Sequence, residues 1–217
     1  MVFYYENKAK KKGFKFIVGV DEAGRGPLAG PVVASAVLLK SHRFKNRIDD
    51  SKKLSSLQRE KAFKEIIKKS FFGLGVVSES AIDKINILKA THLAMEKALF
   101  DLFSKLNKSN KIAKTKFKKS VCALIDGSPL SLEVPCAIKN IIKGDSKSLS
   151  IACASIIAKV TRDRMMVALD KIKPQYGFLK HKGYGTEAHI RAIRKFGPSI
   201  YHRKSFIPEK CLKTKSN

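Results

Sequence analysis

Acidic residues are scarce in this chain of 217 residues. Asp and Glu together number 18 against 45 Lys and Arg, which gives a formal net charge of +27. A surface this basic attracts polyanions, and nucleic-acid phosphates are the commonest of these. The alternative is a lysine-biased composition in which most of the charge is only solvated. The charge therefore concerns the partner of the protein and not its fold.

Cysteine pairs and long apolar runs are also missing. No Cys-x-x-Cys motif and no histidine at zinc spacing occurs, so we expect free thiols in a reducing compartment. No apolar run is long enough for a signal peptide or a membrane span. These absences predict a cytoplasmic protein with no membrane partner, and nothing in the sequence demands a dimer, so we expect a monomer. The cysteines are Cys122, Cys136, Cys153 and Cys211.

The order of the apolar segments predicts an α/β fold with a mixed sheet in a single domain spanning residues 1–217, because strands cluster early and helices late. Residues 1–13 form a polar, lysine-rich lead-in, and Lys105–Lys119 is read as a mobile surface loop, either merely solvated or contacting phosphate. The expected strands are Phe14–Val20, Val32–Leu39, Phe71–Val77, Val121–Ile125 and Ala137–Ile142. The expected helices are Ser56–Lys69, Ile87–Leu106, Ser148–Lys171 and Thr186–Phe196.

Carboxylates stand at the ends of three of these strands. Asp21 and Glu22 follow the first strand, and Asp126 and Asp145 follow the last two. Adjacent strand residues point to opposite faces, so the first two serve one site only if the strand ends or bends there. With no Cys or His in the motifs, these oxygen donors favour Mg²⁺ or Mn²⁺ over zinc. Any one of them alone is more readily explained as a turn-capping residue.

The chemistry of phosphodiesters favours metal ligands over bare acids and bases. General acid–base catalysis contributes about 10²–10⁴-fold, whereas enzymatic accelerations commonly exceed about 10⁶-fold and phosphate esters react slowest without a catalyst. A pair of metal ions can activate water and stabilise the leaving oxygen together. We therefore interpret the acids as metal ligands.

Two glycine-flanked segments contain candidate substrate contacts. Gly24-Arg25-Gly26 allows the backbone to approach a ligand, and Arg25 can fork to a phosphate; a tight turn with a surface arginine is the alternative. Tyr184 lies in a glycine-rich loop before a helix, where it can stack on a base or sugar, or else fold onto the core. His181 is more simply explained as a surface histidine than as a phosphate contact.

The chain resembles bacterial ribonuclease HII, the type 2 ribonuclease H. The similarity spans nearly the whole chain, in family order, and the sister type ribonuclease HIII usually has a lysine where this chain has Arg25. The matching segments are GVDEAGRGPLAGPVVASAVLL (19–39), DDSKKLS (49–55), IDG (125–127), KGDSKSLSIACASIIAKVTRDRMM (143–166) and YGFLKHKGYGTEAHIRAIRKFGPSIYHRKSF (176–206).

The resemblance implies a ribonuclease H-like mixed sheet flanked by helices, with a small helical C-terminal region over about 172–217 that carries Tyr184. It implies that Gly24, Arg25 and Gly26 sense the ribose 2′-hydroxyl and that Tyr184 packs on the sugar at the RNA–DNA junction. Asp163 is read as a helix-surface partner of Arg162 or a lysine rather than as a metal assistant. The implied metal-binding and catalytic acids are Asp21, Glu22, Asp126 and Asp145.

The resemblance also implies the reaction. It is hydrolysis of the RNA strand of RNA/DNA hybrids, and cleavage 5′ of ribonucleotides embedded in duplex DNA, by Mn²⁺ or Mg²⁺, with two ions during catalysis. The products carry 3′-hydroxyl and 5′-phosphate ends, and the role is in DNA replication and repair. Two alternatives stay open: another ribonuclease H-like nuclease, such as a Holliday-junction resolvase, and a non-catalytic basic RNA-binding or ribosome-associated protein.

Overall fold

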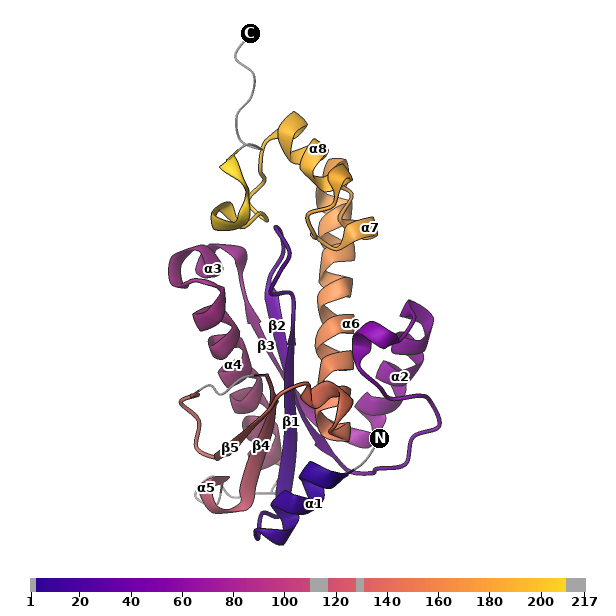
Figure 1. Ribbon diagram of the computed structural model, residues 1–217, viewed down its shortest axis with the longest axis vertical. Coiled ribbons are helices and arrows are strands. Elements are labelled where there is room, and N and C mark those ends of the chain that lie inside the picture. The colour runs from indigo at the N-terminus through magenta and orange to yellow at the C-terminus, as the bar shows by residue number, and fades with distance from the viewer. Residues whose placement is uncertain (1–2, 110–116, 128–130, 210–217) are drawn as a thin grey trace.

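A mixed five-stranded sheet forms the centre of the protein in the computed structural model, which describes residues 3–109, 117–127 and 131–209 (Figure 1). The strand order is β3-β2-β1-β4-β5. The first three strands along the chain pair antiparallel, while β4 lies parallel to both β1 and β5. The expected mixed sheet is confirmed. The strands are β1 (Phe16–Ala23), β2 (Val32–Leu39), β3 (Ser70–Val77), β4 (Val121–Asp126) and β5 (Ala137–Ile141).

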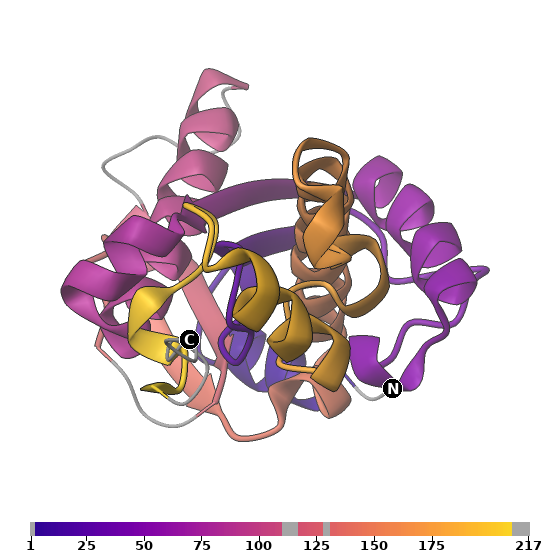
Figure 2. The ribbon, with the colours of Figure 1, turned by 90° about the horizontal axis from the view of Figure 1, so that it is seen from above.

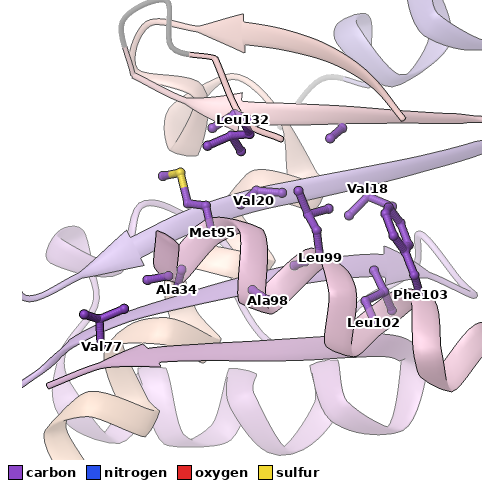
Figure 3. Packing of buried hydrophobic residues seen from close by; sticks show 14 of the residues in the cluster. Val18, Val20, Ala34, Val77, Met95, Ala98, Leu99, Leu102, Phe103 and Leu132 are labelled. Carbon is purple, nitrogen blue, oxygen red and sulfur yellow. The ribbon is translucent and has the colours of Figure 1, made fainter. Parts of the chain in front are cut away.

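Helices cover both faces of this sheet (Figure 2). One core lies between the sheet and α4 (Ile87–Lys108), where Val18 and Val20 meet Leu99 (Figure 3). The other lies between the sheet, α2 (Ser56–Lys69) and α6 (Leu149–Ile172). Alternate residues of β1 therefore face opposite helices. The remaining helices are α1 (Tyr4–Lys11), α3 (Glu79–Ile85), α5 (Phe117–Ser120), α7 (Phe178–His181) and α8 (Glu187–Phe196), with 3₁₀ turns η1 (Ser51–Lys53), η3 (Gly144–Ser146), η4 (Pro174–Tyr176) and η5 (Lys204–Phe206).

The small residues of α6 allow it to lie directly on β1, as expected. A Cβ atom added at Gly19 would stand 2.0 Å from the carbonyl carbon of Ser150, so only glycine fits between strand and helix. The side chain of Ser148 caps the helix by accepting a hydrogen bond from the Ile151 N–H at 3.3 Å. This contact matters for function because β1 and α6 both supply residues to the site below.

The lysine-rich lead-in of residues 1–13 is a helix in part, which corrects the sequence prediction. In α1, Glu6 is buried and accepts hydrogen bonds from the Ser148 hydroxyl at 2.6 Å and from the Ser150 N–H at 3.0 Å. A carboxylate is favourable there because the N-terminus of α6 presents unpaired N–H groups and a partial positive charge. The sequence did not indicate this helix, because the lysines on its solvent face make the segment resemble an unstructured polar lead-in.

Further features of the fold differ from the expectations. Strand β1 runs on through Ala23, because the ladder to β2 continues to the Ala23–Val33 pair. Helix α3 was not predicted. The expected loop Lys105–Lys119 begins within α4 and ends within α5, and residues 110–116 lie outside the described part of the chain.

The C-terminal region is helical, as the resemblance implies, and lies beyond the ends of β1 and β2 at the top of Figure 1. The Ala29 backbone bridges to His202, so this region is tied to the loop between these two strands. Cys122 and Cys153 are buried free thiols, and Cys211 lies outside the described residues. Among the helices that the structure describes, none is both long and apolar enough to cross a bilayer.

Candidate active site

Three carboxylates converge at one edge of the sheet. Asp21 lies in β1, Asp126 ends the parallel neighbour β4, and Asp145 lies in η3 just after β5. One oxygen from each is within 4.8 Å of the others. The parallel pairing explains the convergence, since Val20 opposes Ile125 and the next residue on each strand is an aspartate. We call these three side chains the grouped acids.

Local hydrogen bonds fix the orientation of the grouped acids. The Gly144 N–H donates to Asp126 Oδ1 at 2.6 Å, which ties η3 to the end of β4. A Cβ at Gly144 would stand 2.6 Å from Ile151 Cδ1 and 3.3 Å from the same oxygen, so glycine gives this turn room between α6 and Asp126. The Glu22 N–H donates to Asp21 Oδ1 at 2.7 Å, and burial leaves Asp21 only 5% exposed. The carboxylates are therefore held before any ligand arrives.

Glu22 lies beside the grouped acids but does not belong to them. It lines the same hollow, and its Oε1 pairs with Arg25 Nη1 at 3.5 Å. Strand β1 does not end at Glu22, because it continues to Ala23 in register with β2. Asp21 and Glu22 nevertheless reach one hollow.

Mutual repulsion and burial destabilise the charged acids. Burial, with the charges of Glu22 and Asp126, raises the pKa of Asp21 well above its ordinary value. Burial also raises the pKa of Glu22, against the opposing effect of Arg25. The pKa of Asp145 rises for the same reason, with Asp126 as the neighbouring charge. A cation among these groups would relieve the repulsion.

Asp21 and Asp126 line a hollow of about 460 Å³ that also contains the expected substrate-contacting residues, and Asp145 lies against both with a carboxylate oxygen within 4.8 Å of theirs. Gly24, Arg25 and Gly26 form one wall and Tyr184 another. Tyr184 is 45% exposed, so the alternative in which it folds onto the core is wrong. Its Cε1 atom would stand 4.0 Å from a Cβ placed at Gly26, which brings the two glycine-flanked segments face to face.

Four polar residues of this hollow were not identified from the sequence: Ser51, Lys52, Ser155 and Lys159. The Ser51 and Ser155 hydroxyls lie 2.9 Å apart, and the Ser155 hydroxyl lowers the pKa of Asp21 by hydrogen bonding. Burial lowers the pKa of Lys52, but Asp50 and the grouped acids outweigh it, so the pKa is raised. The signal was available in the segments 49–55 and 143–166, which matched the family but in which these four residues had no assigned role.

The structure also shows the contacts of Asp163 and His181, for which the sequence left alternatives. Asp163 Oδ1 pairs with Lys159 Nζ at 2.8 Å, in agreement with the lysine partner considered for it. His181 is half-buried, and the backbone contacts both of its ring nitrogens. Its Nε2 lies 2.8 Å from the Tyr176 carbonyl, and its Nδ1 accepts a hydrogen bond from the Gly183 N–H at 3.2 Å. It therefore shapes the loop that carries Tyr184.

Comparison with known proteins decides the family. The model of the family described as "Ribonuclease HII" matches residues 18–208. The chain belongs to the ribonuclease HII family. Ribonuclease HII of Chlamydia muridarum is 50% identical over 208 residues, 95% of this chain and 88% of the relative. That of Bacillus subtilis is 47% identical over 205 residues, 94% of this chain and 74% of the relative. The chain is therefore a nuclease, a hydrolase of the ribonuclease H type.

Solved structures agree on the ribonuclease H-like fold. Ribonuclease H2 from Pyrococcus horikoshii has a TM-score of 0.66 at 24% identity, covering 92% of this chain and all of that one. A second match is the structure titled "Crystal structure of Bst-RNase HIII in complex with Mn2+", with a TM-score of 0.69 at 21% identity, covering 91% of this chain and 69% of that one. At these identities the likeness concerns the fold alone.

The donor set fits a hard divalent cation. The ligand atoms of the grouped acids are carboxylate oxygens, which suit Mg²⁺ or Mn²⁺, and no thiol or imidazole lines the hollow among the described residues. Their spacing of at most 4.8 Å is short enough for one ion to contact more than one of them. The site is therefore chemically suited to the metal that is typical of the family.

Proposed function

We propose that this protein is an endonuclease that hydrolyses the RNA strand of RNA/DNA hybrids and cuts 5′ of a ribonucleotide embedded in duplex DNA. The products would carry 3′-hydroxyl and 5′-phosphate ends. One observation carries the proposal: Asp21, Asp126, the Gly24-Arg25-Gly26 segment and Tyr184 line a single hollow, with Asp145 grouped against the two aspartates, in a protein of net charge +27. A general cation site would need only the acids.

The proposed metal ligands are Asp21, Asp126 and Asp145, with Glu22 at the margin, holding Mn²⁺ or Mg²⁺ and two ions during catalysis. Bound ions would neutralise the phosphate, activate water and stabilise the leaving oxygen. The protein itself holds the carboxylates in position for these ions. Buried, hydrogen-bonded carboxylates need little rearrangement when a cation arrives. Arg25, paired with Glu22 across 3.5 Å, is within reach of the same phosphate.

Recognition of the ribonucleotide is proposed to lie on the opposite walls of the hollow. The 2′-hydroxyl is the group that distinguishes RNA from DNA at one nucleotide. Gly24, at φ +99°, leaves the room that Arg162 occupies, whereas a Cβ at Gly26 would meet only Tyr184 Cε1 at 4.0 Å, so the backbone at Gly26 can approach a sugar closely. A site built to hydrogen-bond a hydroxyl rejects the analogue lacking it by about 10⁴–10⁵. Tyr184 would pack on the sugar from the other side.

Affinity without base recognition would come from the basic surface, since phosphate contacts position a duplex and carry no sequence information. Lys52 and Lys159, at the rim of the hollow, are the cations placed to meet a backbone there. Binding should weaken steeply as salt rises because counterions are released. A monomeric state and a cytoplasmic location stay predictions.

A cleavage assay tests the proposal. The protein would be incubated with Mg²⁺ or Mn²⁺ and three substrates: a duplex containing one ribonucleotide, an all-DNA duplex of equal sequence, and an all-DNA four-way junction. We expect cleavage of the first alone, with the cut 5′ of the ribonucleotide. Cleavage of the junction would favour a resolvase, and binding without cleavage would favour a basic RNA-binding protein.

A further inference from the structure

Two arginines outside the proposed catalytic set are completely buried next to it. Arg162 lies in α6 and Arg203 lies just before η5, and each has 0% exposed surface. Buried guanidinium groups usually pair with carboxylates because the desolvation cost is large. Among the ion pairs of the described residues, none involves either arginine. The Glu79 carboxylate favours both charges from a distance, but no carboxylate makes a direct ion pair with either guanidinium among the described residues.

Backbone carbonyls take the place of carboxylates. Arg203 donates to the carbonyls of Gly24 at 2.6 Å, of Arg25 at 3.0 Å and of Gly30 at 2.7 and 2.9 Å. Burial lowers the pKa of Arg203 to about 10, which leaves it charged at neutral pH. Every one of these carbonyls belongs to the loop 24–31 between β1 and β2.

Arg162 joins the same loop to the loop that carries the tyrosine. It donates to the carbonyls of Pro31 at 2.9 Å, of Ala29 at 2.9 Å and of Lys182 at 3.0 Å. The two loops are also bonded directly, because the Leu28 N–H donates to the Gly183 carbonyl at 2.8 Å. One guanidinium thus holds both proposed sugar-contacting walls, although they lie more than 150 positions apart in the sequence.

The direction of these bonds has a chemical consequence. With the Gly24 and Arg25 carbonyls turned inward to Arg203, none of the described residues accepts a hydrogen bond from the N–H of Arg25 or Gly26. Both residues are exposed and line the hollow. Unpaired, outward N–H groups suit an acceptor such as a ribose hydroxyl oxygen.

From this geometry we propose that Arg162 and Arg203 are positioning residues for ribonucleotide recognition. We call the hydrogen bonds from these two arginines to backbone carbonyls the carbonyl clamp. The clamp holds the 24–31 loop with its carbonyl oxygens facing inward and its N–H groups facing outward, and it sets the distance between this loop and Tyr184. The inference rests on the proposed function and adds two residues that touch neither metal ligand nor substrate. It requires the planar fork of arginine, because one lysine ammonium cannot reach carbonyls on several sides at once.

The test uses Arg162→Lys and Arg203→Lys, which keep the charge and remove the fork. For each we would measure kcat/KM on a single-ribonucleotide duplex, the Ki of an all-DNA duplex as competitor, and the Mn²⁺ concentration for half-maximal rate. We expect kcat/KM to fall at least about tenfold in both, since a site that hydrogen-bonds a hydroxyl is sensitive to geometry. The Ki and the Mn²⁺ dependence should stay within about twofold, because neither depends on the hydroxyl.

The matched control is Arg164→Lys on the same helix, where the arginine is exposed and pairs with Glu60 at 2.7 Å; its kcat/KM should not change. A folded Arg162→Lys or Arg203→Lys variant with wild-type kcat/KM would overturn the proposal. So would loss of folding in both, judged by thermal melting, because the clamp would then serve the fold alone. If the wild-type protein itself fails to cut the ribonucleotide duplex, the proposed function fails first, independently of either variant.

Discussion

The sheet edge and the C-terminal region hold their functional side chains by different means. The grouped acids occupy regular strands or the turn next to one, and ladder hydrogen bonds fix their backbone. Tyr184 lies in a loop whose backbone is held by side chains, namely Arg162, His181 and His189. The first arrangement follows from secondary structure. The tyrosine loop depends on polar contacts between residues that are distant in the sequence. Substitution of these polar side chains should therefore disturb the recognition of the substrate more easily than the metal site.

A chain of neutral imidazoles supports the tyrosine loop. The Ser199 N–H donates to His202 Nδ1 at 3.0 Å, and the two Nε2 atoms of His202 and His189 lie 3.0 Å apart. His189 Nδ1 lies 2.9 Å from the Tyr184 carbonyl. These bonds assign one proton to each ring, with His202 donating to His189 and His189 donating to the carbonyl. Protonation of either ring would break this pattern.

The largest effect should come from the sheet edge. We expect Asp126→Asn to reduce cleavage by roughly 10³-fold or more, because loss of even one transition-state hydrogen bond commonly costs about 10²–10³-fold. The amide keeps an oxygen to accept the Gly144 N–H, so the fold should be retained. Hybrid binding should stay within a few fold, measured by fluorescence anisotropy without metal. The control, Glu187→Gln, removes one negative charge from a fully solvated position and should cut normally.

Wild-type turnover by Asp126→Asn would contradict the assignment of the grouped acids. Glu187→Gln should turn over normally. A large loss of turnover in this control would show that the net charge of the protein, and not the position of the lost carboxylate, governs the rate.

A smaller loss is expected on the recognition side. Tyr184→Ala should lower kcat/KM for the single-ribonucleotide duplex by roughly 5- to 150-fold, the equivalent of about 1–3 kcal/mol for the loss of one stacking surface. Tyr184→Phe keeps the ring and should retain most of the activity. Steady-state kinetics of the two variants would check this. If Tyr184→Ala were as active as Tyr184→Phe, Tyr184 would have no role in substrate recognition.

The sequence predicted the sheet edge better than the recognition loops. Apolar runs identified every strand to within three residues, and parallel pairing of β1 and β4 is what brings Asp21 and Asp126 together. Nothing in local spacing shows that Arg203 would reach the carbonyls of Gly24 and Gly30, since bonds between distant segments have no periodic pattern. For the same reason α1 was missed, because its anchor Glu6 bonds to Ser148.

Acid should loosen the C-terminal region before the sheet. Burial, with repulsion from His181 at His189 and from His189 at His202, lowers the pKa of both His189 and His202 to about 4. The unfolded chain binds protons near pH 6.5, so stability is fully present above that value and is lost as pH falls towards 4. Each histidine should cost about 1–2 kcal/mol of unfolding free energy between pH 7 and pH 5. Denaturant unfolding at both pH values, with His202→Gln as the non-titrating variant, would show it; an identical pH dependence in the variant would refute the assignment.

The smallest effect concerns Asp163. Its pairing with Lys159 at 2.8 Å is an i,i+4 contact on α6, and such pairs contribute about 0.3–0.5 kcal/mol. Asp163 neither belongs to the grouped acids nor lines the hollow, so Asp163→Asn should cost only about that much stability and leave cleavage nearly unchanged. Rates measured across a Mn²⁺ titration would check this. If Asp163→Asn needed a much higher Mn²⁺ concentration to reach the same rate, Asp163 would be a metal ligand and not only a partner of Lys159.

Calorimetric titration of Mn²⁺ into the protein tests the central claim most directly. Wild-type protein and Glu187→Gln should bind Mn²⁺ alike, and Asp126→Asn should bind it at least about tenfold more weakly, since even an indirect partner of a metal ligand typically matters by about 10–100-fold. Equal affinity and stoichiometry in wild type and Asp126→Asn would contradict the account, because the three converging carboxylates would then not be what holds the ion.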